Sequence, residues 1–226
     1  MLNNKPSAVL FDLDGTIADT ALDLAATLNH LLITSGRNKI HHDLVRNMVG
    51  EGARALIIKG FEYNNEELTD QEVEVLHDEY INYYRSHIAD KTVLFPNVFI
   101  TLETLVRQNI PLAICTNKSI ELTHLLLKQL KIFDFFTAVT CGDSFAYKKP
   151  DPRHLITTCK LMKADPKQAV MVGDSINDIE AAKKANMLSV GVSFGYTLTP
   201  INELSPNIII NHFNEFFDAL NKVKPR

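Results

Sequence analysis

Phe11-Asp12-Leu13-Asp14-Gly15-Thr16 is the stretch that decides the fold of this chain. The apolar residues 8–11 are typical of a strand buried on both faces. Two aspartates follow one residue apart, and alternation along a strand points both carboxylates the same way. Gly15 then permits a tight exit from the strand. Open α/β sheets bind ligands at this end of their strands, so the stretch indicates a functional site. A plain polar turn is the alternative, and the rest of the chain decides between them.

The composition fits a globular protein with one large domain, or a core with a small second domain. The chain has 226 residues, of which 46% are hydrophobic and 22% charged. A net charge of -4 gives no electrostatic case for binding nucleic acid. The N-terminus lacks the apolar core of a signal peptide, and no apolar run approaches membrane-spanning length. The three cysteines lie far apart without a Cys-x-x-Cys pair, which predicts reduced, buried thiols and a cytoplasmic location.

Residues 17–90 have the pattern of helices, and we expect no strand among them. One helix is predicted from Thr20 to Gly36, with Thr20 as its N-cap and Asp23 answering three positions on. A second begins near residue 43 and is interrupted by Gly50-Glu51-Gly52. A third covers about 66–87 and carries a stripe of tyrosines, which we expect in the core of a small helical bundle.

From residue 95 onward, apolar strands alternate with helices. The predicted strands are 112–115, 138–140, 169–172, 188–192 and 207–210, and the predicted helices are 97–108, 119–130, 153–162, 177–185 and 215–223. This alternation indicates βα units on a parallel sheet. The predicted fold class is therefore α/β, with a Rossmann-like parallel core at 1–16 and 91–226 and an inserted α-helical cap at 17–90.

Further polar groups follow the other predicted strands. Thr116-Asn117 comes directly after 112–115, Lys149 precedes the helix after 138–140, and Asp174 with Asp178 follows 169–172. Parallel strands bring such exits to one edge of the sheet, so we expect these groups to converge. Each motif alone fits a turn, a loop or a helix cap, but the occurrence of all four in register with the strands makes coincidence improbable.

The converging groups suit phosphoryl chemistry. Clustered carboxylates repel one another unless a cation compensates them, and oxygen ligands of this kind suit Mg²⁺ together with substrate phosphate. Lys149 adds positive charge, and Thr116-Asn117 adds neutral donors for phosphate oxygens. Asp12 is a candidate nucleophile that would form an aspartyl-phosphate. Asp14 is placed to protonate a leaving oxygen and then to activate water.

These motifs resemble those of the haloacid dehalogenase superfamily, in the branch with a helical cap after the first motif. The residues that match are Asp12-Leu13-Asp14-Gly15-Thr16, Thr116-Asn117, Lys149 and Gly173-Asp174 with Asp178. The match covers nearly the whole chain and implies a Rossmann-like core. Within the superfamily the chain is most similar to bacterial phosphoglycolate phosphatases, on stretches such as Val49-Gly50-Glu51-Gly52-Ala53 and Thr116-Asn117-Lys118.

The resemblance implies a role for each motif. Asp12 is the implied nucleophile and Asp14 the implied general acid and base. Asp12, Asp174 and the backbone carbonyl of Asp14 are the implied Mg²⁺ ligands. Thr116 and Lys149 would bind the phosphoryl group with support from Asn117, and Asp178 would orient the others.

The implied reaction is Mg²⁺-dependent hydrolysis of a small phosphorylated metabolite, 2-phosphoglycolate, to glycolate and phosphate. Dehalogenases of the superfamily lack an aspartate at the position of Asp14, and Leu24 stands where a hexose-phosphate mutase carries a histidine. The alternatives are a phosphatase of a sugar phosphate such as N-acetylmuramic acid 6-phosphate, a pyrophosphatase or phosphomutase, and a phosphate-sensing binding module without catalysis.

In the cap, Arg54 after Gly50-Glu51-Gly52 is the candidate ligand for the substrate carboxylate, and a solvated arginine is the equal alternative. We expect a monomer or homodimer.

Overall fold

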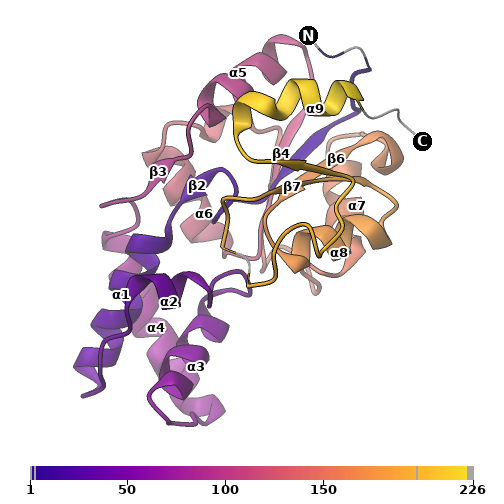
Figure 1. The fold of residues 1–226 in the computed structure, drawn as a ribbon. Helices are drawn as coiled ribbons and strands as arrows, with labels where there is room; N and C mark the ends of the chain where they lie inside the picture. Colours follow the sequence, from indigo (N-terminus) through magenta and orange to yellow (C-terminus); the bar gives the residue numbers. More distant parts are fainter. Residues whose placement is uncertain (1, 3, 197, 223–226) are drawn as a thin grey trace.

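The computed structural model describes residues 2, 4–196 and 198–222 (Figure 1). These residues form a six-stranded sheet in the order β5-β4-β1-β6-β7-β8, in which all neighbours are parallel. The strands are β1 (Val9–Phe11), β4 (Leu112–Cys115), β5 (Ala138–Thr140), β6 (Val170–Gly173), β7 (Leu188–Val192) and β8 (Ile208–Ile210). The predicted parallel α/β core is therefore confirmed.

Helices cover both faces of the sheet because successive side chains of each strand point to opposite faces. Val9 and Phe11 pack with apolar residues of three helices on one face, and Leu10 packs with two helices on the other. The helices of the first face are α5 (Val98–Arg107), α6 (Ile120–Gln129) and α9 (Phe216–Lys222), and those of the second are α7 (Pro152–Leu161) and α8 (Ile176–Lys184). Buried on both sides, the strands contain few polar residues.

The position of β1 explains why the motifs meet. Phe11 is in register with Ile114 of β4 on one side and with Val172 of β6 on the other. The chain leaves these three neighbouring strands at the same edge, carrying Asp12, Thr116 and Asp174 with it. The predicted convergence at one edge of the sheet follows directly from this order.

Four of the helices between β1 and β4 lie together beyond that edge of the sheet (Figure 1). They are α1 (Ala21–Thr34), α2 (His42–Arg46), α3 (Ala53–Tyr63) and α4 (Asp70–Ser86). Their buried side chains belong to one apolar cluster, which includes Leu28 of α1, Ile57 and Phe61 of α3, and Tyr84 of α4. We call residues 17–90 the cap, although this boundary stays a prediction.

The expectation that the cap contains no strand is wrong. Strand β2 (Ala18–Asp19) pairs antiparallel with β3 (Val93–Leu94), so the two chain segments that enter and leave the cap are hydrogen-bonded to each other. Two residues are too few to show the alternation by which a strand is recognised in a sequence.

The predicted capping pair at the start of α1 is also wrong. Thr20 makes no side-chain capping hydrogen bond. The buried carboxylate of Asp23 instead accepts hydrogen bonds from the backbone N–H groups of Lys91 and Thr92 and from the Thr92 hydroxyl, at 2.7–3.1 Å. Asp23 therefore links α1 to the segment that returns to the core. Its partners Lys91 and Thr92 lie 68 and 69 positions further along the chain.

The predictions for the first cap helix and for the helices and strands of the core agree with the structure to within one or two residues at the described ends. The other cap helices differ more, because the helix predicted to begin near residue 66 begins at Asp70, and the one predicted to run from about 43 to Gly50 ends at Arg46. The predicted end of the last helix, Val223, lies outside the described residues. Cys115, Cys141 and Cys159 are free and buried, as predicted. No helix among the described residues is long and apolar enough to cross a membrane.

Candidate active site

Asp12 lies at the exit of β1 beside a buried lysine. Lys149 Nζ is 2.8 Å from Asp12 Oδ1 and 2.6 Å from Asp178 Oδ1, and all three side chains are at most 10% exposed. Burial lowers the pKa of Lys149, but attraction by Asp12 and Asp178 outweighs burial and raises it. Burial raises the pKa of Asp12 to about 6, although Lys149 opposes that change. Lys149 thus stays charged and holds two carboxylates in place.

Asp178 is fixed on its other oxygen. The backbone N–H and hydroxyl of Ser175 donate to Asp178 Oδ2 at 3.0 and 2.7 Å, which forms a capping box at the start of α8. With Oδ1 bound by Lys149, the Asp178 carboxylate is held from both sides. This arrangement fits the predicted orienting role.

Asp174 follows β6 and is fixed by two donors. The Thr16 hydroxyl donates to Oδ1 at 2.8 Å, and the Tyr196 backbone N–H donates to Oδ2 at 2.7 Å. The chain passes close by at Gly15, where φ is +82° and an added Cβ would lie 2.6 Å from Asp174 Oδ2. Only glycine suits that position. Burial, followed by repulsion from Asp178 and Asp12, raises the pKa of Asp174 to about 8.

The residues present fit a divalent cation. Carboxylate oxygens of Asp12, Asp174 and Asp178 lie within 4.8 Å of one another, and all three residues are buried. Such a cluster is unfavourable on its own, and its all-oxygen donor set is the kind that Mg²⁺ prefers. An aspartate cluster in this site can therefore bind a metal ion.

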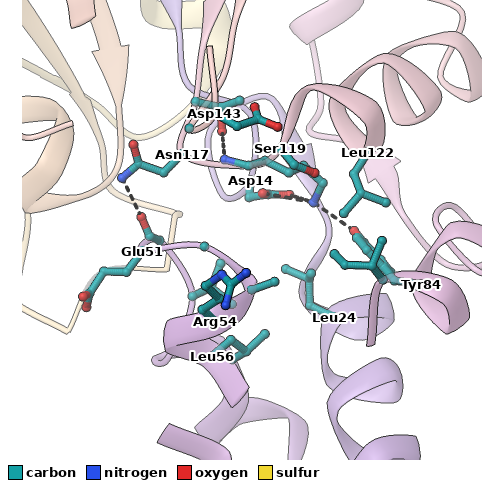
Figure 2. A pocket seen from close by; sticks show the side chains of 18 of the residues that line it. Asp14, Leu24, Glu51, Arg54, Leu56, Tyr84, Asn117, Ser119, Leu122 and Asp143 are labelled. Atoms are coloured by element: carbon teal, nitrogen blue, oxygen red, sulfur yellow. Dashed lines mark hydrogen bonds and ion pairs between the residues drawn. The ribbon is translucent and has the colours of Figure 1, made fainter. Parts of the chain in front are cut away.

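Asp14 faces away from this cluster, toward the cap. Lys118 Nζ donates to Asp14 Oδ1 and Oδ2 at 3.0 and 3.2 Å, and it donates to the Tyr84 hydroxyl of α4 at 3.0 Å. Figure 2 shows Asp14 and Tyr84 on opposite sides of this contact. The Lys118 and Asp14 side chains are only 6% and 14% exposed. The buried ammonium thus connects the predicted acid and base to the cap.

Thr116 and Asn117 lie at the exit of β4, but they serve different groups. Thr116 is 2% exposed, and its hydroxyl oxygen accepts a long hydrogen bond from the Lys118 backbone N–H at 3.3 Å. The Asn117 amide donates to the carbonyls of Gly50 and Lys149, at 3.2 and 3.0 Å. The Asn117 amide therefore donates to backbone here, whereas the Thr116 hydroxyl accepts from backbone and keeps its own O–H to donate. The phosphate role of Asn117 stays a prediction.

Residues 49–52 of the cap cross the open side of the site. The Gly50 carbonyl accepts from Asn117 and also from Asn177 Nδ2 at 3.2 Å, and Lys148 Nζ donates to the Glu51 carbonyl at 2.9 Å. This segment separates two cavities of about 170 Å³ each, both of which contact Asp12 and Asp14. One extends toward Asp174, and the other lies between the core and helices α3 and α4. We call the latter the cap-side cavity.

Arg54, the predicted carboxylate ligand, lines the cap-side cavity from α3 (Figure 2). Its guanidinium makes two hydrogen bonds to the Glu74 carboxylate, and its side chain is 49% exposed. The side-chain hydrogen bond to Glu74 raises the pKa of Arg54. Its charge is therefore already paired, which weakens its case as an anion ligand.

Sequence reasoning missed two residues of the site. Lys118 follows Thr116-Asn117 directly, and its place after a strand exit was a usable signal. Tyr196 gave no local signal, since its ring lies near Gly15 and its hydroxyl contacts Asp19 and the N–H groups of Thr20 and Ala21 only in the folded chain.

Comparison with known proteins agrees with this geometry. Residues 9–192 match the family model of the haloacid dehalogenase-like hydrolases. The chain is 41% identical to a phosphoglycolate phosphatase of Agrobacterium fabrum, over 93% of this chain and 91% of the relative. It is 36% identical to one of Psychrobacter arcticus, over 96% of each chain.

Among solved structures, a predicted phosphoglycolate phosphatase of Haemophilus somnus matches with a TM-score of 0.91 and 31% identity. That match covers 96% of this chain and 98% of the other. The chain is therefore a phosphoric monoester hydrolase, and it belongs to the haloacid dehalogenase-like hydrolase family.

Proposed function

We propose that the protein hydrolyses 2-phosphoglycolate to glycolate and phosphate, with Mg²⁺ and through an aspartyl-phosphate on Asp12. The observation that carries this proposal is the pairing at the exit of β1. Asp12 lies against Lys149 in a buried carboxylate cluster, while Asp14 faces the opposite side and contacts a different lysine. One carboxylate can thus attack phosphorus while the other serves the leaving group.

In the first step, an oxygen of Asp12 attacks phosphorus and the bond to the ester oxygen breaks. Lys149 holds Asp12 through Oδ1 and brings positive charge to the place where phosphate oxygens would lie. Thr116, buried at the neighbouring strand exit, would donate its hydroxyl to one of those oxygens. These fixed donors stabilise the negative charge of the transferring group.

Asp14 would handle the protons of both steps. As an acid it gives a proton to the departing ester oxygen, and as a base it takes a proton from the water that then attacks the aspartyl-phosphate. Its carboxylate lies in the cap-side cavity, where a leaving group can be accommodated. General acid and base catalysis of this kind is typically worth about 10² to 10⁴ in rate.

Asp12, Asp174 and the backbone carbonyl of Asp14 would hold the metal ion, with Asp178 orienting Lys149. When bound, Mg²⁺ neutralises the charge that otherwise keeps an anionic nucleophile from an anionic phosphate. The raised pKa values of Asp12 and Asp174 support this assignment, because burial raises both and repulsion by neighbouring carboxylates raises them further. Identity of the ion as Mg²⁺ rests on the donor set and on the family.

The relatives support 2-phosphoglycolate as the substrate. The cap-side cavity also suits a small anion, because it is small and is lined by the buried Lys118 ammonium beside Asp14. The test is a panel of phosphate esters assayed with and without a chelator. We expect 2-phosphoglycolate to have the highest kcat/KM and activity to vanish without the metal. A preference for a sugar phosphate would contradict the substrate, and full turnover without metal would contradict the cofactor.

A further inference from the structure

Three side chains that can donate hydrogen bonds line the cap-side cavity, and some of their O–H and N–H groups have no acceptor within the described part of the chain. Tyr80 and Tyr84 of α4 and Lys118 of the core all line this cavity. The Tyr80 hydroxyl is buried in a residue only 1% exposed and has no hydrogen-bond partner among the described residues. A buried hydroxyl without a partner costs free energy, so such a group in a cavity points to a ligand.

The other two donors also have capacity to spare. The Tyr84 oxygen accepts from Lys118, and its own O–H proton remains to be donated. Lys118 has three N–H donors, of which one can serve both Asp14 oxygens and one serves Tyr84. Burial raises the pKa of both tyrosines well above the ordinary value, so both hydroxyls stay protonated donors.

We infer that Lys118, Tyr80 and Tyr84 form the binding site for the carboxylate of the substrate and so determine its specificity. This inference rests on the proposed function. In 2-phosphoglycolate a single methylene separates the carboxylate from the ester oxygen, and Asp14 must reach that oxygen. A cation that touches Asp14 is therefore within reach of the carboxylate. The ammonium between the two anions also screens their repulsion.

In the part of the chain that the structure describes, one other lysine and one arginine line this cavity, and neither offers a buried charge that could bind the carboxylate as Lys118 could. The guanidinium of Arg54 is paired with Glu74 and half exposed. Lys148 is exposed and donates to the Glu51 carbonyl. A charge-assisted hydrogen bond is stronger where water is excluded, which favours the buried ammonium. The apolar side chains of Leu24, Leu56 and Leu122 also line the cavity (Figure 2).

The experiment compares 2-phosphoglycolate with 2-hydroxyethyl phosphate, in which a hydroxymethyl group replaces the carboxylate. The measured quantity is the ratio of the two kcat/KM values in the holoenzyme. Tyr80→Phe removes only the free hydroxyl and should lower this ratio about tenfold, mainly through KM for 2-phosphoglycolate. Lys118→Met should lower the ratio about 100-fold, in addition to slowing both substrates through Asp14.

Two matched variants serve as controls. Tyr83→Phe removes a hydroxyl from the same helix, on a half-buried ring that stacks on His30 outside the cavity. Lys128→Met removes an exposed ammonium from α6, where Lys128 lies over Phe133. Neither control should change the ratio. Circular dichroism and thermal unfolding check that each variant is folded.

The outcomes separate the two claims. A wild-type preference for 2-phosphoglycolate that falls in Tyr80→Phe and Lys118→Met supports the carboxylate site. The same preference with an unchanged ratio in both variants overturns the site and leaves the proposed function standing. A wild-type enzyme that prefers 2-hydroxyethyl phosphate overturns both.

Discussion

Two buried lysines serve the two aspartates of the first motif, and they differ in what else they touch. Lys149 binds Asp12 and Asp178, which both belong to the core. Lys118 binds Asp14 and the Tyr84 hydroxyl, which belongs to the cap. The proposed nucleophile is therefore held by the core alone, whereas the proposed acid and base is held by the core and the cap together.

This difference implies that the two sides of the proposed site have different roles. In the proposed mechanism Asp12, Lys149 and Asp174, which all follow strands of the core sheet, act on the phosphoryl group and would serve any phosphate ester. The choice of ester would then depend on the side of Asp14, where residues of α3 and α4 line the cavity. Variants on the two sides should consequently differ in kind: core variants should damage every substrate equally, and cap-side variants should change the ranking of substrates.

The largest effect is expected from Asp12→Asn. The amide keeps the shape of the side chain but is a poor nucleophile, so turnover of every substrate should fall to background. Asp165→Asn is the matched control, because Asp165 lies before β6, at the opposite end of that strand from Asp174. Steady-state assays of both variants give the answer, and substantial turnover in Asp12→Asn would rule out the nucleophile assigned here.

Asp14→Asn should come next, with a loss of about 10² to 10⁴ in kcat, because both proton transfers depend on this carboxylate. The loss should be smaller for an aryl phosphate, whose leaving oxygen needs less protonation. Assays with 2-phosphoglycolate and an aryl phosphate measure the difference. Equal losses of less than tenfold for both esters would contradict the role of Asp14.

Asp174→Asn should have a thermodynamic signature as well as a kinetic one. The pKa values of Asp12 and Asp174 are higher in the folded chain than the ordinary value of 3.8. The metal-free stability of the protein should therefore fall as pH rises from about 4 to about 8. The variant removes one of these charges. Its metal-free Tm at pH 8 should therefore be a few degrees higher than that of wild type.

Thermal unfolding in chelator across this pH range measures the effect. Added Mg²⁺ should raise the Tm of the wild type and have much less effect on Asp174→Asn. Equal stabilisation of both proteins by Mg²⁺ would place the metal elsewhere.

The sequence was sufficient for the core side of the site. Asp12, Lys149, Asp174 and Asp178 are set by short motifs at strand exits, and the order of parallel strands brings them together. Apolar strands flanked by helical patterns made that order predictable in outline.

The cap side could not be derived in this way. The contacts of Lys118 with Tyr84 and of Asp23 with Thr92 join residues 34 and 69 positions apart, with no motif to pair them. Arg54 looked free in the sequence because its partner, Glu74, lies 20 positions away on another helix. Packing between helices, rather than a local pattern, sets these contacts.

The smallest effect is expected from Arg54→Ala. Since Glu74 already pairs this guanidinium at a half-exposed position, its removal should change kcat/KM for 2-phosphoglycolate less than about threefold. Arg37→Ala is the matched control, because Arg37 forms a similar pair with Glu66 away from the cavity. A loss of about 100-fold confined to 2-phosphoglycolate would return carboxylate recognition to Arg54.

Detection of phosphorylated Asp12 tests the central claim most directly. The holoenzyme is mixed with excess 2-phosphoglycolate, quenched in acid within a turnover and digested for peptide mass spectrometry. We expect the peptide containing Asp12 to carry one phosphoryl group, which is lost on treatment with hydroxylamine, as for an acyl phosphate. Tyr80→Phe should form the same species at saturating 2-phosphoglycolate, and Asp12→Asn should form none. A phosphoryl group on another residue, or turnover without any phosphorylated peptide, would contradict the account.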